Sequence, residues 1–287
     1  MKKIIFEDKE RKVMKKILFI IILFMLFWVG DSVKAISVEK YTDAEYELLK
    51  KYMSEEEIQY SSEFVIDSIL NENVEAYDSF IVASTYYHGN NLYPKLVKSE
   101  VITDFNQLNL DVENEFSLLS GNSDEHTTDY KYIQLMTNSG SSPKRFYIYN
   151  KWLKMPKNKS FDVIALRWNS GFTLTEYYGN QYTNGNSGDI AYPIGNSNYK
   201  IGSNAIGLSQ NLVDSATSIE NELIIWGTCS SDGTIYGTYQ HAQSDITLAT
   251  SKLYNFSVSG MGNVLSFYGN ASEIYDDTPG LSLSYTC

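Results

Sequence analysis

The residues of this sequence most able to do metal chemistry are its three histidines. They lie in separate segments, at His88, His126 and His241. None belongs to a paired pattern such as H-E-x-x-H or C-x-x-C, which zinc sites usually show. Asp124-Glu125-His126, with Asp129 close behind, has the groups that bind divalent ions, but in a polar loop such groups are ordinarily solvated. We therefore expect neither a metal site nor a cofactor.

Nucleophilic and acid–base catalysis find equally little support. No G-x-S-x-G motif occurs, and Cys229 could act as a nucleophile with His241 only if its sulfur were not bridged. We expect His241, at the end of a strand, to be satisfied by a partner inside the fold. Asp276 and Asp277 could be named as a glycosidase pair, but adjacent strand residues point to opposite faces. The sequence therefore favours a binding protein over an enzyme and assigns no catalytic residue.

The segment 177–204 reads YYGNQYTNGNSGDIAYPIGNSNYKIGSN, and 19 of its 28 residues are Tyr, Gly, Asn or Ser. Tyrosine rings lose little rotamer entropy on contact, and Asn, Ser and Gly supply adaptable hydrogen bonds. We expect loops that contact a glycan or a protein surface through five tyrosines: Tyr177, Tyr178, Tyr182, Tyr192 and Tyr199. The alternative left open is that the segment only makes turns between strands, where tyrosine is also common.

The N-terminal segment predicts export. The 13 apolar residues 17–29 would form a helix of about 20 Å, shorter than the roughly 30 Å of a bilayer core. Lys15 and Lys16 precede this run, and Val33-Lys34-Ala35 follows it as a cleavage signal. We expect a signal peptide over residues 1–35, with translation starting at Met14, and a secreted, extracellular product. An uncleaved anchor is the alternative.

The mature chain is strongly acidic. The whole sequence has a net charge of −12, and removal of residues 1–35 leaves 15 basic and 31 acidic side chains, a charge of −16. Nucleic acids and anionic lipids are recognised by clustered Lys and Arg, so neither is an expected partner. We expect no stable membrane anchor after cleavage, and the sequence leaves the oligomeric state open.

Both cysteines, Cys229 and Cys287, survive the cleavage. An even number of cysteines in an exported chain predicts a disulfide, which we expect to staple the C-terminus to a neighbouring strand.

Residues 36–75 have the period of short helices. Thr42 with Glu45, and Ser54 with Glu57, are capping-box pairs that mark helix starts. We expect a short acidic helical segment whose narrow apolar stripes pack on the domain that follows.

Residues 76–287 change to a period of two, with at least nine strand-like runs separated by turn signals. This pattern predicts a mainly β fold, an antiparallel β-sandwich. Asp232-Gly233 is read as a two-residue hairpin between flanking strands. In the last run, Leu281, Leu283 and Tyr285 should face the core.

The helical start, with Thr42 and Ser54 each opening an acidic turn, and the tail from FDVIALRW through GTYQHAQSDITLATSKLYNFSVSGMGNVLSF to LSLSY together resemble uncharacterised secreted proteins of Gram-positive bacteria. This resemblance implies export and a β-rich body in a bacterial protein. It brings no catalytic residue.

The function expected from the sequence is a secreted, non-catalytic binding protein. The alternative is a membrane-active, pore-forming toxin, since tyrosines suit an interfacial belt. The acidic helical segment 36–75 argues against a toxin, because helices that bind membrane interfaces usually carry Lys and Arg on their polar face. A hydrolase acting outside the cell ranks below both.

Overall fold

The computed structural model describes residues 40–71, 74–87, 95–102, 126–139, 143–169, 171–184, 188–258 and 262–287. The chain divides after Met53 into two compact units. The predicted signal peptide and its cleavage site lie outside the described residues, as do His88, Asp124 and Glu125.

Helix α2 (Asp43–Leu49) belongs to the first unit, and α3 (Glu55–Tyr60) opens the second. Both begin with the predicted capping box. The Glu45 carboxylate accepts from the Thr42 backbone N–H at 2.7 Å, and the Thr42 hydroxyl accepts from the Glu45 N–H at 3.3 Å. Ser54 and Glu57 repeat the arrangement at 2.7 and 3.2 Å. Each box satisfies two N–H groups that a helix start would leave unpaired, so these boundaries are fixed by local sequence.

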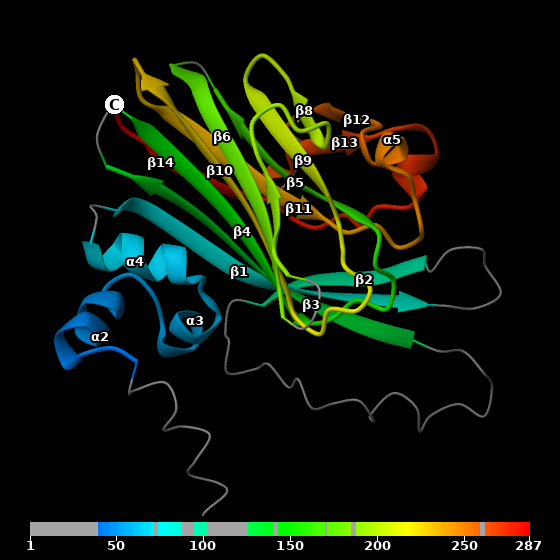
Figure 1. Cartoon of the computed structure of the whole chain (residues 1–287), viewed down its shortest axis with the longest axis horizontal. Helices are drawn as coiled ribbons and strands as arrows, with labels where there is room; N and C mark the ends of the chain where they lie inside the picture. Colours follow the sequence, from blue (N-terminus) through cyan, green and yellow to red (C-terminus); the bar gives the residue numbers. More distant parts are fainter. Residues whose placement is uncertain are drawn as a thin grey trace, which may run out of the picture. The chain divides into compact units, whose positions relative to one another are not determined.

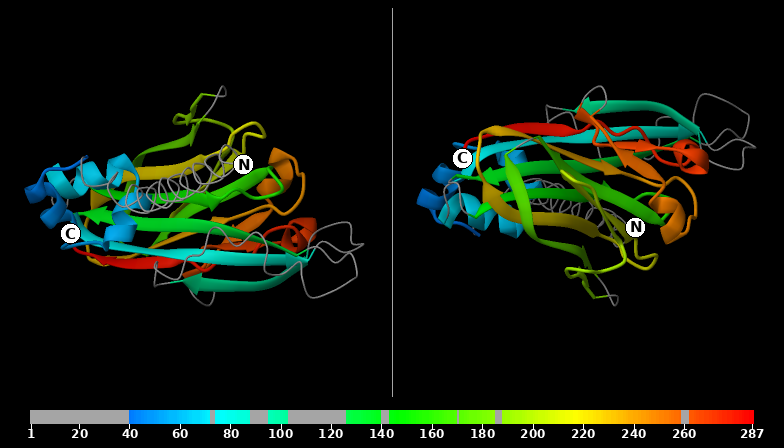
Figure 2. Two further views of the ribbon diagram at one scale, coloured as in Figure 1. Left: turned by 90° about the horizontal axis from the view of Figure 1, so that it is seen from below. Right: turned by 90° about the horizontal axis from the view of Figure 1, so that it is seen from above.

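The second unit is an antiparallel sandwich of two sheets, as predicted (Figures 1 and 2). The seven-stranded sheet has the order β2 (Lys95–Ile102), β1 (Val74–Tyr87), β3 (His126–Asn138), β4 (Lys144–Lys154), β10 (Ile219–Cys229), β6 (Phe172–Thr183), β7 (Ile190–Tyr192). The five-stranded sheet has the order β14 (Leu281–Tyr285), β11 (Gly233–Gln240), β5 (Phe161–Trp168), β9 (Ala205–Asn211), β8 (Tyr199–Ile201).

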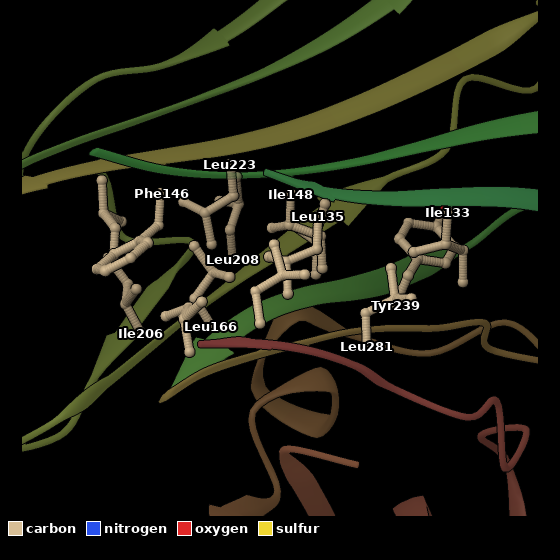
Figure 3. Close-up of a cluster of buried hydrophobic side chains, with 14 of the residues drawn as sticks. Ile133, Leu135, Phe146, Ile148, Leu166, Ile206, Leu208, Leu223, Tyr239 and Leu281 are labelled. Atoms are coloured by element: carbon tan, nitrogen blue, oxygen red, sulfur yellow. The ribbon is translucent and has the colours of Figure 1, made fainter. Parts of the chain in front are cut away.

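The main core lies between the two sheets (Figure 3). Alternate residues of each strand point inward, such as Phe146 and Ile148 of β4, opposite Leu166 of β5. The last strand follows the predicted alternation: Leu281, Leu283 and Tyr285 are buried, while the serines between them are exposed. Each fully buried apolar side chain of this size stabilises the fold by about 1.5–3 kcal/mol.

Helices α3 and α4 (Glu63–Asn71) cover part of the outer face of the seven-stranded sheet, over β3 and β4. Tyr147 points outward from β4, and its ring stacks on Phe64 with centroids 4.7 Å apart. The hydroxyl groups of Tyr147 and Ser62 lie 2.8 Å apart, in hydrogen-bond contact. The prediction that the apolar stripes of the helical segment pack on the following domain is confirmed for these two helices, whose buried residues include Ile58 and Ile66.

A smaller layer covers the outer face of the five-stranded sheet. It is formed by α5 (Leu248–Ser251), the hairpin of β12 (Tyr254–Phe256) and β13 (Leu265–Phe267), and the 3-10 helix η3 (Gly269–Glu273). Tyr254 and Val264 pack there against Val163 and Ala165, the outward-facing residues of β5. Each sheet is therefore covered on its inner face by the other sheet and on part of its outer face by these smaller elements.

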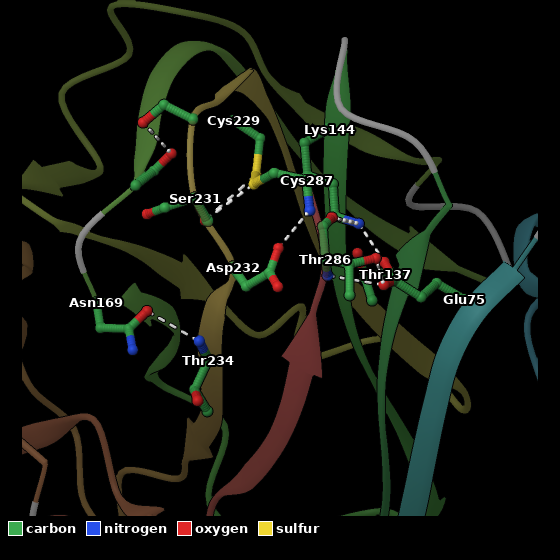
Figure 4. Close-up of a disulfide and its surroundings, with 12 residues drawn as sticks. Glu75, Thr137, Lys144, Asn169, Cys229, Ser231, Asp232, Thr234, Thr286 and Cys287 are labelled. Carbon is green, nitrogen blue, oxygen red and sulfur yellow. Dashed lines mark hydrogen bonds and ion pairs between the residues drawn. A yellow bond between two sulfur atoms is a disulfide. The ribbon is translucent and has the colours of Figure 1, made fainter.

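The disulfide between Cys229 and Cys287 is present, with Cα atoms 5.5 Å apart (Figure 4). The predicted hairpin at Asp232-Gly233 is wrong, because β10 lies in the seven-stranded sheet and β11 in the five-stranded one. This turn crosses between the sheets, and the bridge therefore joins the last residue of β10 to the segment after β14 on the opposite sheet. The disulfide links the two sheets rather than two neighbouring strands.

Candidate functional site

All five tyrosines predicted for binding lie in strands. Tyr177, Tyr178 and Tyr182 belong to β6, Tyr192 to β7 and Tyr199 to β8. The expectation of binding loops is therefore wrong for these residues, because the tyrosines themselves take part in the backbone pairing of both sheets. The turns of the segment are made by other residues, including Gly188 and Gly195, whose positive φ values of 66° and 83° favour glycine.

Three of these tyrosines point to the interior. Tyr192 and Tyr199 are core residues, and the Tyr199 hydroxyl donates to the Tyr192 backbone carbonyl at 2.5 Å. Tyr177 is partly buried and meets Tyr199 edge to face, with ring centroids 4.6 Å apart. The rings of Tyr192 and Tyr199 are thus unavailable to a surface partner in this structure, and the five tyrosines do not form one patch.

The other two tyrosines share the outer face of the seven-stranded sheet. Tyr178, Asn180 and Tyr182 are alternate residues of β6, partly exposed, and we call them, together with Glu222 of β10, the tyrosine ladder. The Tyr178 hydroxyl donates to the Asn180 amide oxygen at 3.2 Å, and the Asn180 amide nitrogen donates to the Tyr182 hydroxyl at 2.9 Å. The Tyr182 hydroxyl in turn donates to the Glu222 carboxylate at 2.7 Å.

The ladder ends in a carboxylate that is nearly inaccessible to solvent. Burial raises the pKa of Glu222, and the hydrogen bonds from Tyr182 and Asn180 oppose that rise. Burial and the nearby Glu222 charge also raise the pKa of Tyr182, so its phenol stays protonated at physiological pH and donates to Glu222. The Cα atoms of Tyr178 and Tyr182 are about 13 Å apart along the strand, and the hydrogen bonds of both hydroxyls to the Asn180 amide bring the outer ends of the two rings closer together.

A second group of polar residues lies inside the sandwich, where the inner face of the sheets changes from apolar to polar. His241 lies at the end of β11, and its Nδ1 is 2.9 Å from Oδ1 of Asp162 on β5. Burial alone would lower the pKa of His241, but Asp162 and Asp276 outweigh this effect and raise it. The Tyr239 hydroxyl donates to the other oxygen of Asp162 at 2.5 Å.

The same interior region holds a buried ion pair. Lys131 of β3 contacts the carboxylate of Asp276 and donates to the Thr278 hydroxyl at 2.5 Å. Asp276 also accepts from the backbone N–H of His241 at 2.8 Å. Asp129 lies nearby, and burial raises its pKa to about 6. All of these groups are buried, and the charge of Lys131 is paired with that of Asp276 inside the fold.

The interior group can position and stabilise, but the structure does not present it to a substrate. The prediction that His241 is satisfied by a partner matches its contact with Asp162. Cys229 is bridged and is therefore not a thiolate nucleophile. Within the described residues, no group of three or more His, Cys, Asp or Glu could hold a metal ion. No helix among them is long and apolar enough to cross a bilayer.

No protein-family model matches the chain, and no curated protein matches it. Among solved structures, the collagen-binding domain from a Staphylococcus aureus adhesin matches with a TM-score of 0.29 and 6% identity, covering 50% of this chain and 88% of that domain. A structure titled as manganese lipoxygenase of Gaeumannomyces graminis and partial zonadhesin of Komagataella pastoris matches with a TM-score of 0.25 and 8% identity, covering 59% and 78%. At such TM-scores neither neighbour informs the function of this chain.

Two members of the ladder, Asn180 and Glu222, were not predicted. The sequence carries one signal for the first: Y-x-N-x-Y over 178–182 puts these side chains on one face once the segment is a strand. Glu222 lies 40 residues from Tyr182, and only the pairing of β6 with β10 brings the two together.

Proposed function

We propose that this protein is a secreted, non-catalytic binding protein that contacts a glycan through the tyrosine ladder. The observation that carries the proposal is the placement of Tyr178, Asn180 and Tyr182 on one partly exposed strand face, held by the hydrogen bonds that end on Glu222. Two rings held by hydrogen bonds on one strand need little ordering when a ligand binds, and preorganisation of this kind favours affinity.

The chemistry of the ladder suits a sugar chain. Phenol rings offer apolar area for the C–H faces of sugar rings, and each has a hydroxyl that can exchange hydrogen bonds with sugar hydroxyls. The Asn180 amide supplies both a donor and an acceptor between the two rings. Helices α3 and α4 bury outward tyrosines of β3 and β4, such as Tyr132 and Tyr147, whereas Tyr178 and Tyr182 of the ladder on β6 remain partly exposed.

A glycan array with the purified chain tests the proposal. The double variant Tyr178→Ala/Tyr182→Ala should lose at least about tenfold in affinity for a glycan that the wild type binds, since aromatic contacts usually dominate such interfaces. Tyr268→Ala is the matched control, because Tyr268 is 45% exposed and lies outside the ladder. Equal glycan binding by the wild type and the double variant would refute the ladder as the site, and binding confined to protein ligands would refute the glycan.

The export part of the proposal has its own measurement. A disulfide is stable in an oxidising compartment, which supports export. N-terminal sequencing of protein recovered from culture medium should begin at Ile36. Extracellular material that still contains the run 17–29 would contradict cleavage after Ala35.

A further inference from the structure

The edges of the two sheets differ in length. Among the described residues, β7 and β8 are edge strands of three residues each and β14 has five, whereas β2 has eight. Proteins commonly protect sheet edges by keeping edge strands short, since a long edge offers unpaired backbone groups to another chain. In both views of Figure 2, β2, in teal, lies at one outer margin of the second unit, as expected for an edge strand. Among the described edge strands, β2 is the longest and has the most backbone groups that could pair with another chain.

Strand β2 also exposes apolar side chains. Val97 is 57% exposed and Val101 is 38% exposed. Pairing with β1 puts Val101 opposite Val82, whose side chain points to the core, and Ser99 opposite Ser84. Thr85 of β1 pairs with Lys98 and Tyr86 pairs with Leu96, so Val97 is the extra residue of a β-bulge and has no partner on β1. Two valines thus lie exposed on either side of Ser99.

The charges of β2 flank the same residue. Lys98 and Glu100 pair with Thr85 and Ala83 of β1, so they share the face opposite to Ser99. Their side chains contact each other as an ion pair, and both are more than half exposed. The strand therefore reads Val97, Lys98, Ser99, Glu100, Val101. A valine lies two positions away on each side of Ser99, and the residues directly before and after it have opposite charges.

We propose that β2 pairs antiparallel with β2 of a second copy of this chain, about a two-fold axis at Ser99. In this register Lys98 of each copy lies opposite Glu100 of the other, and Val97 lies opposite Val101. Both copies use the same surface, as a two-fold dimer requires. The seven-stranded sheets of the two copies become one continuous sheet, and two exposed valine pairs leave water.

Other registers lose these matches. A shift by one residue moves every side chain to the other face and puts valines opposite charged residues. A parallel arrangement in register would put Lys98 of one chain beside Lys98 of the other, and like charges would then be neighbours. Only the antiparallel register centred on Ser99 gives two attractive charge pairs, and like charges directly opposite in a sheet are destabilising. This charge complementarity identifies a second copy, rather than an unrelated extended peptide, as the occupant of the edge.

Charge reversal tests the proposal directly by sedimentation velocity over a range of protein concentrations. Lys98→Glu and Glu100→Lys should each weaken dimerisation about tenfold, because each puts like charges opposite each other twice per dimer. The double variant Lys98→Glu/Glu100→Lys should restore it, because the opposite charges are then exchanged between positions. Ile201→Lys, on the edge strand β8 of the other sheet and 51% exposed in the wild type, is the control and should dimerise like the wild type.

Cysteine cross-linking tests the register. Ser99→Cys should give a disulfide-linked dimer on oxidation, because the axis puts residue 99 of the two copies opposite each other. Val97→Cys alone should not cross-link, whereas a mixture of Val97→Cys and Val101→Cys chains should. Binding of glycans by the ladder on β6 is a separate readout, so the two proposals can fail independently.

Three results would overturn the proposal. The wild type could remain monomeric up to its solubility limit. The dimer could survive both single charge reversals, or the double variant could fail to restore it. Cross-linking of Val97→Cys alone as efficiently as Ser99→Cys would refute the register, and a dimer broken by Ile201→Lys instead would place the interface on the other sheet.

Discussion

Asp129 offers a quantitative test of the interior cluster. Its side chain is 5% exposed, and burial raises its pKa from 3.8 to about 6 in spite of the nearby charges of His241 and Lys131. Lys154 also favours the charged form, and Asp276 opposes it. Compared with the unfolded state, the folded state therefore favours the neutral acid at this position, although basic side chains lie nearby.

This shift predicts how the free energy of unfolding depends on pH. Between pH about 4 and 6, the folded state binds a proton at Asp129 that the unfolded state has released, so the free energy of unfolding falls as pH rises. The full difference of about two pKa units corresponds to about 3 kcal/mol, reached above pH 6. His241 contributes in the same direction at higher pH: its raised pKa gives stability that is present below about 6.5 and lost as pH rises through the folded value.

Asp129→Asn should remove the contribution of Asp129, since the amide imitates the neutral acid. We expect the variant and the wild type to be equally stable near pH 4 and the variant to be more stable by up to about 3 kcal/mol at pH 7.5. Urea denaturation followed by tryptophan fluorescence at a series of pH values measures the difference. Asp245→Asn is the control, because Asp245 is exposed and its removal should change stability little at any pH. A constant difference between wild type and Asp129→Asn across the whole pH range would refute the reasoning.

Three further perturbations follow from the same contacts. Cys229→Ser/Cys287→Ser removes the disulfide between residues 58 positions apart and should lower the free energy of unfolding by about 4 kcal/mol. Denaturation of the variant, compared with the oxidised and the reduced wild type, measures this loss. Equal stability with and without the bridge would contradict the prediction. Lys131→Met leaves the buried carboxylate of Asp276 without its ion pair and should lower the free energy of unfolding by about 3–5 kcal/mol. Lys151→Met removes the more exposed pair with Glu220 and should lower it by less than about 1 kcal/mol in the same assay. Ser62→Ala removes the hydrogen-bond partner of the buried Tyr147 hydroxyl and should cost about 1–3 kcal/mol, and Ser62→Ala combined with Tyr147→Phe should recover part of that loss if the unpaired hydroxyl is its cause.

The helix starts show how far local sequence reaches. Thr42 with Glu45 and Ser54 with Glu57 needed only residues three positions apart, and both boxes formed as predicted. The alternation of β14 is equally local, since Leu281, Leu283 and Tyr285 face the core in any half-buried strand. Period and capping therefore determined that the chain is an antiparallel β protein with short acidic helices before it.

The sheet to which each strand belongs was not decided locally. Asp232-Gly233 has the composition of a hairpin turn, but the same turn can also carry the chain from one sheet to the other. Which of the two occurs depends on whether β11 pairs better with β5 and β14 than with β10. The pairing depends on the summed free energies of contacts with residues far away in sequence, and a turn motif contains no information about those contacts.

The site shows the same division. Composition singled out the segment 177–204 and made its tyrosines candidates, but only the packing of two sheets decided that Tyr199 faces the core while Tyr178 and Tyr182 face outward. The contact of His241 with Asp162 joins residues 79 positions apart, and that of Tyr182 with Glu222 joins residues 40 apart. Sequence alone determined the local period and the caps, because neighbours in the chain set them. The partners of each polar side chain were decided by tertiary structure, because burial makes an unpaired polar group costly and the fold must supply its partner from a distance.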